Sequence, residues 1–436
     1  MSKLKSRMIF GAPAALLAIA MAVSGCGSNN GNNEAAGNGA SAGASPAATT
    51  SAEPAKHEKI SFIHWRSEDA DSFNAIIDQF EKEYPNIEVE MQTFPSGEYQ
   101  SIAQQKLLDG SVGDVFASFP GAQFSMIAQS DLYADLTGSP FIDNFEPTLI
   151  EAGQKDGKQL ALPYQLVYNM PVYNVGLFEK LGLEPPKDWD GFLALGEKLK
   201  AEGIIPIAYP GDASQFMNTM MMNNAPDEQI FQKLEAGETT LGDEWWIKTL
   251  TQIKELNDKE FFQKDASGSN SEAAVALFVQ EKAAMIAAGS YAIVGLKKAN
   301  PNLQMKLLAP ITVPADQAVF EGIHTTTFMI GVNSKSKHQE AAKTFISFLS
   351  RADIAAKYAN ETGQNVTIKG VEYTSPELKD IAEWTTRKTR FQPRYLIQNI
   401  EVQKAVVSSI QSVLSGATPE QAAKDSQAII DQQVKK

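Results

Sequence analysis

The chain has 436 residues, of which 52 are acidic and 38 are basic, so its formal net charge is −14 at pH 7. Such an excess of negative charge argues against binding to nucleic acid or to an anionic membrane surface. Hydrophobic residues make up 43% and charged residues 21% of the sequence, which is typical of a globular protein. The single cysteine excludes an intrachain disulfide.

Residues 1–25 have the pattern of a secretory signal peptide. Lys3, Lys5 and Arg7 form a basic start, and residues 8–23 form an apolar run that contains a glycine and a proline. This run is too short and too interrupted for a good transmembrane helix. We therefore expect residues 1–25 to be absent from the mature protein.

Cys26 follows the apolar run directly, after small residues. The stretch 23–26, VSGC, resembles the lipobox of bacterial lipoproteins. The resemblance implies that the Cys26 thiol carries a diacylglyceryl group, whose two acyl chains suffice for stable membrane attachment. The alternative is a buried or reactive free thiol.

Residues 26–59 are predicted to form a flexible tether. Residues 27–59 are rich in Gly, Asn, Ser and Ala and contain no aromatic residue and no Val, Ile or Leu. Such a segment cannot bury enough apolar surface to order itself, and it would reach roughly 30 Å on average. The remaining residues, 60–436, are too many for one typical domain and favour two.

The first elements of this body alternate between strand and helix. Apolar periodicity predicts strands at 59–65, 87–91 and 114–118, and helices at 73–84 and 99–107. Strand, helix, strand, helix, strand indicates a mainly parallel sheet covered on both faces. Ligands of such sheets bind beyond the carboxyl ends of the strands.

The later elements mix strands with longer helical stretches. Strands are predicted within 159–173 and at 204–209, 283–288, 303–308 and 323–332. Helices are predicted within 175–199 and at 271–281, 342–349 and 402–413. Residues 418–421, TPEQ, have the pattern of a capping box with proline at the first helical position.

Many stretches of the body, in the same order along the chain, resemble bacterial extracellular solute-binding proteins of the carbohydrate-binding type. The matching stretches are 60–65, 73–89, 113–115, 156–164, 173–178, 181–183, 186–192, 278–291 and 416–428. No single stretch is specific, but the set covers almost the whole body. Proteins of this family are the substrate-capturing lipoproteins of sugar ABC importers.

The resemblance implies an α/β, two-lobe, periplasmic-binding-protein-like (type II) fold. Each lobe would be a mainly parallel sheet flanked by helices, with three crossovers near Gln165, Ile323 and Gly370. The N-terminal lobe would comprise 60–165 plus 324–370. The C-terminal lobe would comprise 166–323 plus 371–436.

The resemblance also implies a function. A sugar or oligosaccharide would be captured between the lobes by hinge closure and delivered to the permease subunits of an ABC transporter. The protein would be a monomer outside the cytoplasm, held to the cell membrane by its lipid anchor alone, and a Gram-positive host is favoured over a Gram-negative one.

Sugars need aromatic faces for their C–H surfaces and fixed polar groups for their hydroxyls. Residues that follow strand ends or lie near the expected crossovers are the candidates: Trp65, Arg66, Glu68, Ser118, Phe119, Gln123, Tyr164, Gln165, Asp212, Phe216, Ser290, Tyr291, His324 and Gln364. The turn 289–291 matches the family's turn before an aromatic residue, which is usually tryptophan and here is Tyr291. Arg66 and His64 hint at a charged sugar.

Structural roles compete with ligand binding at several of these positions. The segment around Trp65 and Glu68 could simply form the entrance to a helix, and Ser290 could cap the next one. Core packing competes at Phe216. Hinge packing competes at the four candidates near the crossovers, which are Tyr164, Gln165, His324 and Gln364.

The sequence contains no enzyme signature. The four histidines are scattered, with no zinc-protease pair, phosphate loop or dinucleotide fingerprint, and we expect no catalytic residue, metal or cofactor. Two alternatives stay open. One is a lipid-anchored extracytoplasmic glycoside hydrolase, which needs two carboxylates in the cleft. The other is a receptor for a non-sugar solute in the same two-lobe build.

Overall fold

A computed structural model describes residues 57–110, 112–211, 221–309 and 312–434. The chain divides into residues 1–54 and residues 55–436, and all described residues belong to the second part. Three of the residues singled out from the sequence, Cys26, Asp212 and Phe216, lie outside the described ranges.

The first five elements have the predicted order. They are β1 (Glu58–His64), α1 (Ala70–Glu83), β2 (Ile87–Thr93), α2 (Ser96–Asp109) and β3 (Val115–Ser118). The apolar face of α1 is buried through Phe73, Ile76, Ile77 and Phe80, which explains its helical spacing. α2 ends at Gly110, whose φ of +66° lies in the left-handed region that glycine adopts without strain.

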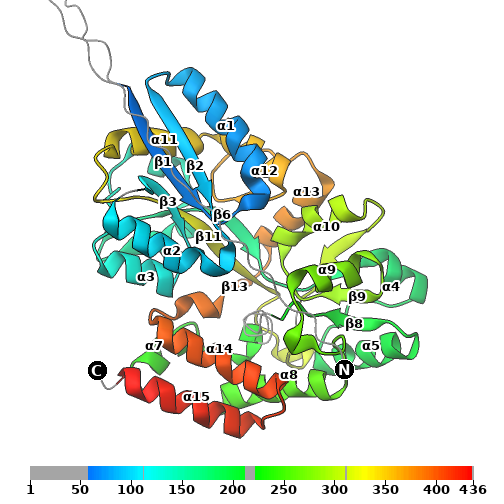
Figure 1. Cartoon of the computed structure of the whole chain (residues 1–436). Helices are drawn as coiled ribbons and strands as arrows, with labels where there is room; N and C mark the ends of the chain where they lie inside the picture. The colour runs from blue at the N-terminus through cyan, green and yellow to red at the C-terminus, as the bar shows by residue number, and fades with distance from the viewer. Residues whose placement is uncertain (1–56, 111, 212–220, 310–311, 435–436) are drawn as a thin grey trace, which may run out of the picture. The chain divides into compact units, whose positions relative to one another are not determined.

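These strands belong to a sheet with the order β12-β6-β11-β3-β1-β2, in which β13 also pairs with β11. Its other strands are β6 (Leu162–Tyr168), β11 (Gly322–Val332), β12 (Asn365–Val366) and β13 (Thr389–Phe391). β1 is parallel to β2 and β3, whereas β11 is antiparallel to β3 and β6. The chain passes from β1 to β2 in one direction and from β2 to β3 in the other. Right-handed crossovers therefore put α1 and α2 on opposite faces (Figure 1).

A second sheet has the order β10-β7-β9-β8. Its strands are β7 (Val172–Asn174), β8 (Ile205–Ala208), β9 (Ala283–Ile286) and β10 (Met305–Leu307). Only β8 and β9 are parallel. The prediction of mainly parallel sheets is therefore wrong in both cases, and the sheets are mixed. The reason is that β6, β7, β10 and β11 do not belong to βαβ units. They pair with strands from distant parts of the chain. A separate pair joins β4 (Gln154–Lys155) and β5 (Lys158–Gln159).

Helices flank both sheets. The first sheet is covered by α1 and α2 and by α3 (Ala122–Gln129), α11 (Gln339–Leu349), α12 (Ala352–Thr362) and α13 (Pro376–Ala382) (Figure 1). Around the second sheet lie α4 (Val175–Leu181), α5 (Trp189–Ala201), α7 (Ile230–Glu235), α8 (Glu244–Asp258), α9 (Ser271–Val279), α10 (Ile293–Ala299), α14 (Ile400–Leu414) and α15 (Pro419–Val434). The predicted helices are confirmed, with ends shifted by a few residues.

Half of the predicted capping box is formed at the start of α15. The Gln421 N–H donates to the Thr418 hydroxyl at 3.2 Å. The Gln421 side chain donates forward to Asp425 at 2.8 Å. The proline at position 419 begins the helix, as predicted.

The buried residues form separate apolar clusters. The largest draws on residues 60–164 and 328–368, around the first sheet. A second draws on residues 173–430 around the second sheet and includes Trp246, whose indole N–H donates to Ser409 at 3.1 Å. A third, between residues 166 and 384, contains the segment that leaves β6 and enters β7. Gln165, near which the first crossover is predicted, lies within the continuous strand β6, and the chain reaches the second sheet only after Tyr168.

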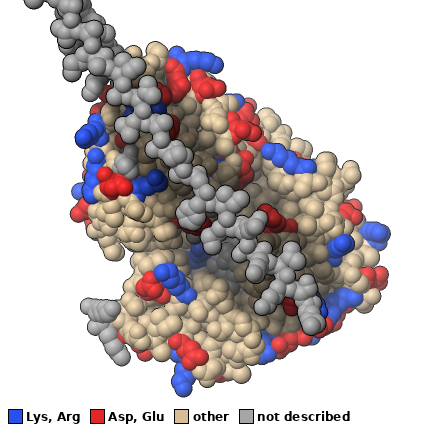
Figure 2. Space-filling view, viewed as in Figure 1, with Lys and Arg blue, Asp and Glu red and all other residues tan. Residues whose placement is uncertain are grey.

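The described surface is mixed in charge. Figure 2 shows acidic and basic side chains interspersed over the visible face. Among the described residues, no helix combines the length and the apolar content that a membrane crossing requires.

Candidate functional site

A cavity of about 510 Å³ opens where the two sheets face each other. From the first sheet, its walls receive the loops that follow β1 and β3 and the side chains of β6 and β11. From the second, they receive the end of β9 and the residues after β8. The carboxyl ends of parallel β1 and β3 therefore deliver their loops to it, as expected for such sheets.

The structure brings seven of the predicted residues to this cavity, namely Trp65, Arg66, Glu68, Phe119, Gln123, Gln165 and Tyr291. Five others do not line it: Ser118, Tyr164, Ser290, His324 and Gln364. The cavity also receives residues that the prediction missed, among them Thr325, Thr327, Asn169, Tyr395 and Gln392.

The side chains of the five excluded residues are engaged elsewhere. Ser118 pairs with the Tyr133 hydroxyl at 2.6 Å, and the Tyr164 hydroxyl donates to the Leu349 carbonyl at 3.0 Å. The Ser290 hydroxyl accepts from the backbone N–H of Tyr168 at 3.1 Å. The hydrogen-bond partners of all three residues lie within the protein.

The other two excluded residues are also held by protein groups. His324 contacts the Thr389 hydroxyl at 2.9 Å, and its ring meets Phe391 edge-on. The Gln364 amide donates to the backbone carbonyl of Tyr291 at 3.3 Å, beneath a residue that does line the cavity.

The alternation of strands explains which residues were missed. On β6, Gln165 and Val167 line the cavity, while Tyr164 before them and Leu166 between them do not. On β11, Thr325 and Thr327 line it while His324 does not. Successive side chains of a strand point to opposite faces, so the period-2 pattern could have selected the threonines had the pairing of β6 with β11 been known.

An aromatic wall is formed by Trp65 and Phe119. Their rings stack with centroids 3.9 Å apart and planes 25° apart. Phe328 meets the Trp65 ring edge-on at 5.2 Å, and its φ of +52° is unusual for a bulky residue. Trp65 is 7% exposed, so it is held by the protein and shows only part of its ring to the cavity.

Arg66 lines the cavity but its charge is already compensated. Its Nε and one terminal nitrogen donate to the two Asp69 oxygens at 2.5 Å and 3.1 Å. Its other terminal nitrogen lies 3.3 Å from a Glu68 oxygen, whose side chain is 58% exposed. A bidentate pair of this kind leaves little of the guanidinium charge for an anionic ligand.

Two buried polar groups on the cavity wall have no hydrogen-bond partner among the described residues. They are the Gln123 Nε2 and the Thr327 hydroxyl, on residues that are 2% and 8% exposed. Buried polar groups are nearly always hydrogen-bonded, because leaving one unpaired costs about 1 to 3 kcal/mol. Groups of this kind on a cavity wall are therefore suited to a ligand's hydroxyls.

His64 lies directly behind this wall and is fully buried. Burial, and after it the nearby charge of Arg66, lowers the pKa of His64 to about 3. Its Nδ1 accepts the backbone N–H of Arg66 at 3.1 Å. His64 is therefore neutral and does not line the cavity. Of the two residues that hinted at a charged sugar, only Arg66 lines it.

This histidine makes stability depend on pH. Because the folded-state pKa of about 3 lies below the unfolded value near 6.5, the unfolded chain takes up the proton first and stability falls as the pH drops below 6.5. Between pH 6.5 and pH 5 the loss should be about 2 kcal/mol from this group. His64→Asn should flatten that part of the pH profile in chemical unfolding experiments. His57→Asn, at an exposed position, is the control, and an equal change in both variants would refute the assignment.

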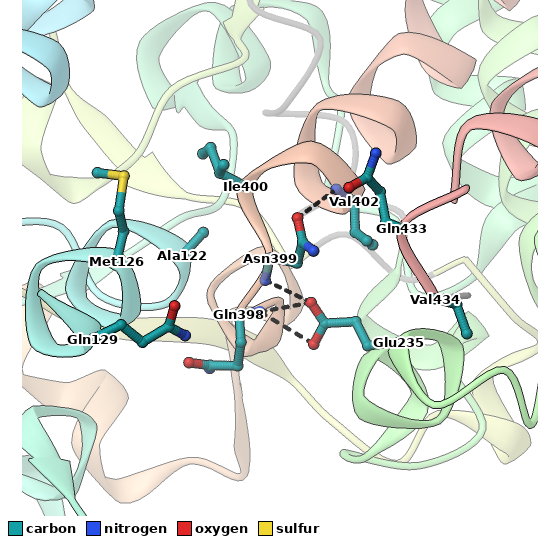
Figure 3. Close-up of a pocket in the computed structure, with 10 residues that line it drawn as sticks. All are labelled: Ala122, Met126, Gln129, Glu235, Gln398, Asn399, Ile400, Val402, Gln433 and Val434. Atoms are coloured by element: carbon teal, nitrogen blue, oxygen red, sulfur yellow. Dashed lines mark hydrogen bonds between the residues drawn. The ribbon is translucent and has the colours of Figure 1, made fainter. Parts of the chain in front are cut away.

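A second cavity, of about 370 Å³, lies between α3, the end of α7, the start of α14 and the end of α15 (Figure 3). Glu235 points across it and accepts the backbone N–H groups of Gln398 and Asn399, at 3.0 Å and 2.6 Å. Burial raises the pKa of Glu235. Its role is to cap α14, and none of the described residues that line this cavity is aromatic.

Among the described residues, no group of three or more His, Cys, Asp and Glu side chains is placed to hold a metal ion. Of the described residues that line the larger cavity, only Glu68 carries a carboxylate.

Comparisons with known proteins agree with this architecture. A multiple sugar-binding protein of Streptococcus mutans is 24% identical over 335 residues, covering 74% of this chain and 78% of that protein. The diacetylchitobiose-binding protein of Streptomyces coelicolor is 25% identical over 186 residues, 41% of this chain and 39% of that protein.

Solved structures share the fold. The solute-binding protein RafE in complex with raffinose superposes with a TM-score of 0.76 at 19% identity, over 86% of this chain and 99% of that one. A sugar transporter protein of Bacillus licheniformis in complex with stachyose gives a TM-score of 0.72 at 21% identity, over 86% and 100%. The two-lobe type II fold is thereby confirmed.

The family model of the bacterial extracellular solute-binding protein matches residues 66–375, which is well over half of the chain. Proteins of this family bind solutes outside the cell. Because this match covers most of the chain, and because the α/β fold has a cavity between its two sheets, the chain belongs to the bacterial extracellular solute-binding proteins.

Proposed function

We propose that this protein captures a neutral sugar or oligosaccharide for an ABC importer. The observation that carries the proposal is the larger cavity, where the stacked Trp65 and Phe119 rings lie on the same walls as the unpartnered polar groups of Gln123 and Thr327. Aromatic faces and fixed hydrogen-bonding groups are what a sugar requires. The names of the related proteins, which bind raffinose, stachyose or diacetylchitobiose, support the same class of ligand.

A neutral sugar is favoured over a uronate by the electrostatics around Arg66. Arg66 is paired with Asp69 and Glu68, and His64 is buried and neutral. Beside Arg66, a carboxylate on the ligand would find no uncompensated cation and would lie near Glu68. The other cation of the described lining, Arg394, lies over the Tyr395 ring at 5.4 Å.

The proposed mechanism is hinge closure. We take the lobes as predicted, 60–165 plus 324–370 and 166–323 plus 371–436, except that the first boundary moves to Tyr168, where β6 ends. A ligand that contacts both lobes stabilises the closed population over the open one. The closed monomer would then deliver the sugar to the permease subunits.

We also propose that the protein is anchored outside the cell membrane through a diacylglyceryl group on Cys26, with the residues up to 59 as a tether. A Gram-positive host fits this arrangement. The proposal includes no catalysis, because glycoside hydrolysis requires two carboxylates at the sugar, whereas Glu68 is the only carboxylate among the described residues of the wall.

The test is a titration of the purified body, residues 57–436, with raffinose, stachyose and diacetylchitobiose and with a uronate-containing oligosaccharide. Calorimetry and the thermal midpoint should show saturable binding and stabilisation by at least one neutral sugar, with product analysis showing no cleavage. Binding of the uronate alone would refute the neutral ligand. Cleavage would favour the hydrolase, and absence of binding to every sugar would favour a non-sugar solute.

A further inference from the structure

Gln165 occupies the floor of the larger cavity and is connected to a chain of buried groups behind it. Its Nε2 is hydrogen-bonded to the Tyr358 hydroxyl. That hydroxyl lies 2.6 Å from Oδ2 of Asp69, and Asp69 is the partner of Arg66. Tyr358 is fully buried and does not line the cavity, so it cannot contact the ligand directly.

The direction of each hydrogen bond in this chain is determined by chemistry. Arg66 can only donate, so the Asp69 carboxylate accepts. Burial, and after it the charge of Asp69, raises the pKa of Tyr358 well above its ordinary value, so the hydroxyl keeps its single proton. That proton is donated to Asp69, and the Tyr358 oxygen is left as an acceptor.

An acceptor at Tyr358 selects one orientation of the Gln165 amide. With Nε2 toward Tyr358, the amide donates and every group in the chain is satisfied. With Oε1 toward Tyr358, Oε1 and the Asp69 carboxylate would compete for one proton. Either Oε1 would face the Tyr358 oxygen with no proton between them, or Asp69 would lose the Tyr358 donor and keep only Arg66. The loss of one such hydrogen bond costs about a factor of 5 to 100 in population.

We propose that Tyr358 is a positioning residue that fixes the Gln165 amide with its carbonyl oxygen toward the cavity, so that the site demands a hydroxyl donor from its ligand at this point. The inference rests on the proposed function and adds the polarity of one contact to it. We call the groups of Arg66, Asp69, Tyr358 and Gln165 the relay.

Gln123 supplies the opposite polarity on the neighbouring wall. Its Oε1 accepts a hydrogen bond at 2.7 Å from the backbone N–H of Phe119, and a backbone N–H can only donate. Its Nε2 is therefore turned the other way, and it is the group without a partner among the described residues. The site thus offers a fixed acceptor at Gln165 and a fixed donor at Gln123, and sugar hydroxyls, which can both donate and accept, can satisfy each of them.

The test is a double-mutant cycle in calorimetry, using whichever of raffinose, stachyose and diacetylchitobiose binds the wild-type body most tightly. Tyr358→Phe should weaken binding by about 3- to 10-fold, because Nε2 loses its buried acceptor and the amide then mostly adopts the reversed orientation, with Nε2 toward the cavity. In a Gln165→Leu background the same change should have less than about a 2-fold effect, because no amide is left to orient. An equal loss in both backgrounds, or no loss in the wild-type background, would overturn the proposal.

Tyr133→Phe is the matched control, because it also removes one buried tyrosine hydroxyl, bonded to Ser118 and away from the cavity. It should reduce stability without changing affinity. A comparable loss of affinity in this variant would show that Tyr358→Phe acts through stability alone and would count against the relay.

A spectroscopic measurement on the ligand-free protein separates the relay from the proposed function. In NMR spectra, the Gln165 side-chain amide is assigned by its absence in Gln165→Leu. One of its two protons should exchange slowly with water in the wild type and in Tyr133→Phe. In Tyr358→Phe both protons should exchange fast. An unchanged resonance in Tyr358→Phe would refute the relay. If this signature is found but no sugar binds, the relay stands and the proposed sugar ligand fails.

Discussion

Trp65→Ala should weaken sugar binding by roughly 1 to 3 kcal/mol, about a 5- to 150-fold increase in Kd, if the ring stacks on the ligand. The ring lines the cavity and is held by Phe119 at 3.9 Å and by Phe328 at 5.2 Å, so it offers a fixed aromatic surface. Calorimetric titration with the best neutral sugar measures the effect. Trp65→Phe keeps an aromatic ring and should lose less.

Removing a buried tryptophan also destabilises a fold, by about 3 to 5 kcal/mol. Trp384→Ala is the matched control, because Trp384 is 6% exposed, close to the 7% of Trp65, and does not line the cavity. It should lower the thermal midpoint comparably and leave the affinity unchanged. If Trp65→Ala binds sugar as tightly as the wild type, or if both variants lose affinity equally, Trp65 is not in the site.

Cys26→Ala should release the protein from the membrane into the medium while leaving folding and sugar affinity intact. The physical reason is that a diacylglyceryl group supplies the two acyl chains that stable attachment requires, whereas the described body has no helix suited to crossing a bilayer. Cell fractionation followed by immunoblotting measures the distribution. Calorimetry on the released protein checks the affinity.

A second variant distinguishes the motif from the thiol. Cys26→Ala combined with Ser41→Cys moves the thiol into the tether, away from the lipobox-like stretch, and should not restore membrane attachment. Continued retention of Cys26→Ala in the membrane fraction would contradict the anchor, and restoration by Ser41→Cys would mean that attachment depends on a thiol but not on the motif.

The local patterns of the sequence predicted elements well where burial repeats with one period. The apolar spacing of Phe73, Ile76 and Phe80 predicted α1, and these side chains are fully buried. The loops after β1 and β3 could be assigned to the site because parallel strands end at one edge, and their residues Trp65 and Phe119 do line the cavity.

The other side of the site was less predictable. Tyr164 and Gln165 are neighbours with similar sequence signals, yet only Gln165 lines the cavity while the Tyr164 hydroxyl bonds to the Leu349 carbonyl. Thr325 and Thr327 look like ordinary strand residues in the sequence, and they were missed. Arg66 hinted at a charged sugar, but Asp69, only three residues later, compensates its charge.

The sequence by itself determined the kinds of elements and their order, because helix and strand periods are written in the spacing of apolar residues along one segment. It also carried the resemblance to the solute-binding family. Only the tertiary structure decided that the sheets are mixed, which face of β6 and β11 looks into the cavity, and that Tyr358 lies behind Gln165. These depend on the pairing of strands more than a hundred residues apart, such as β6 with β11, and no local spacing encodes which face such a pairing turns inward.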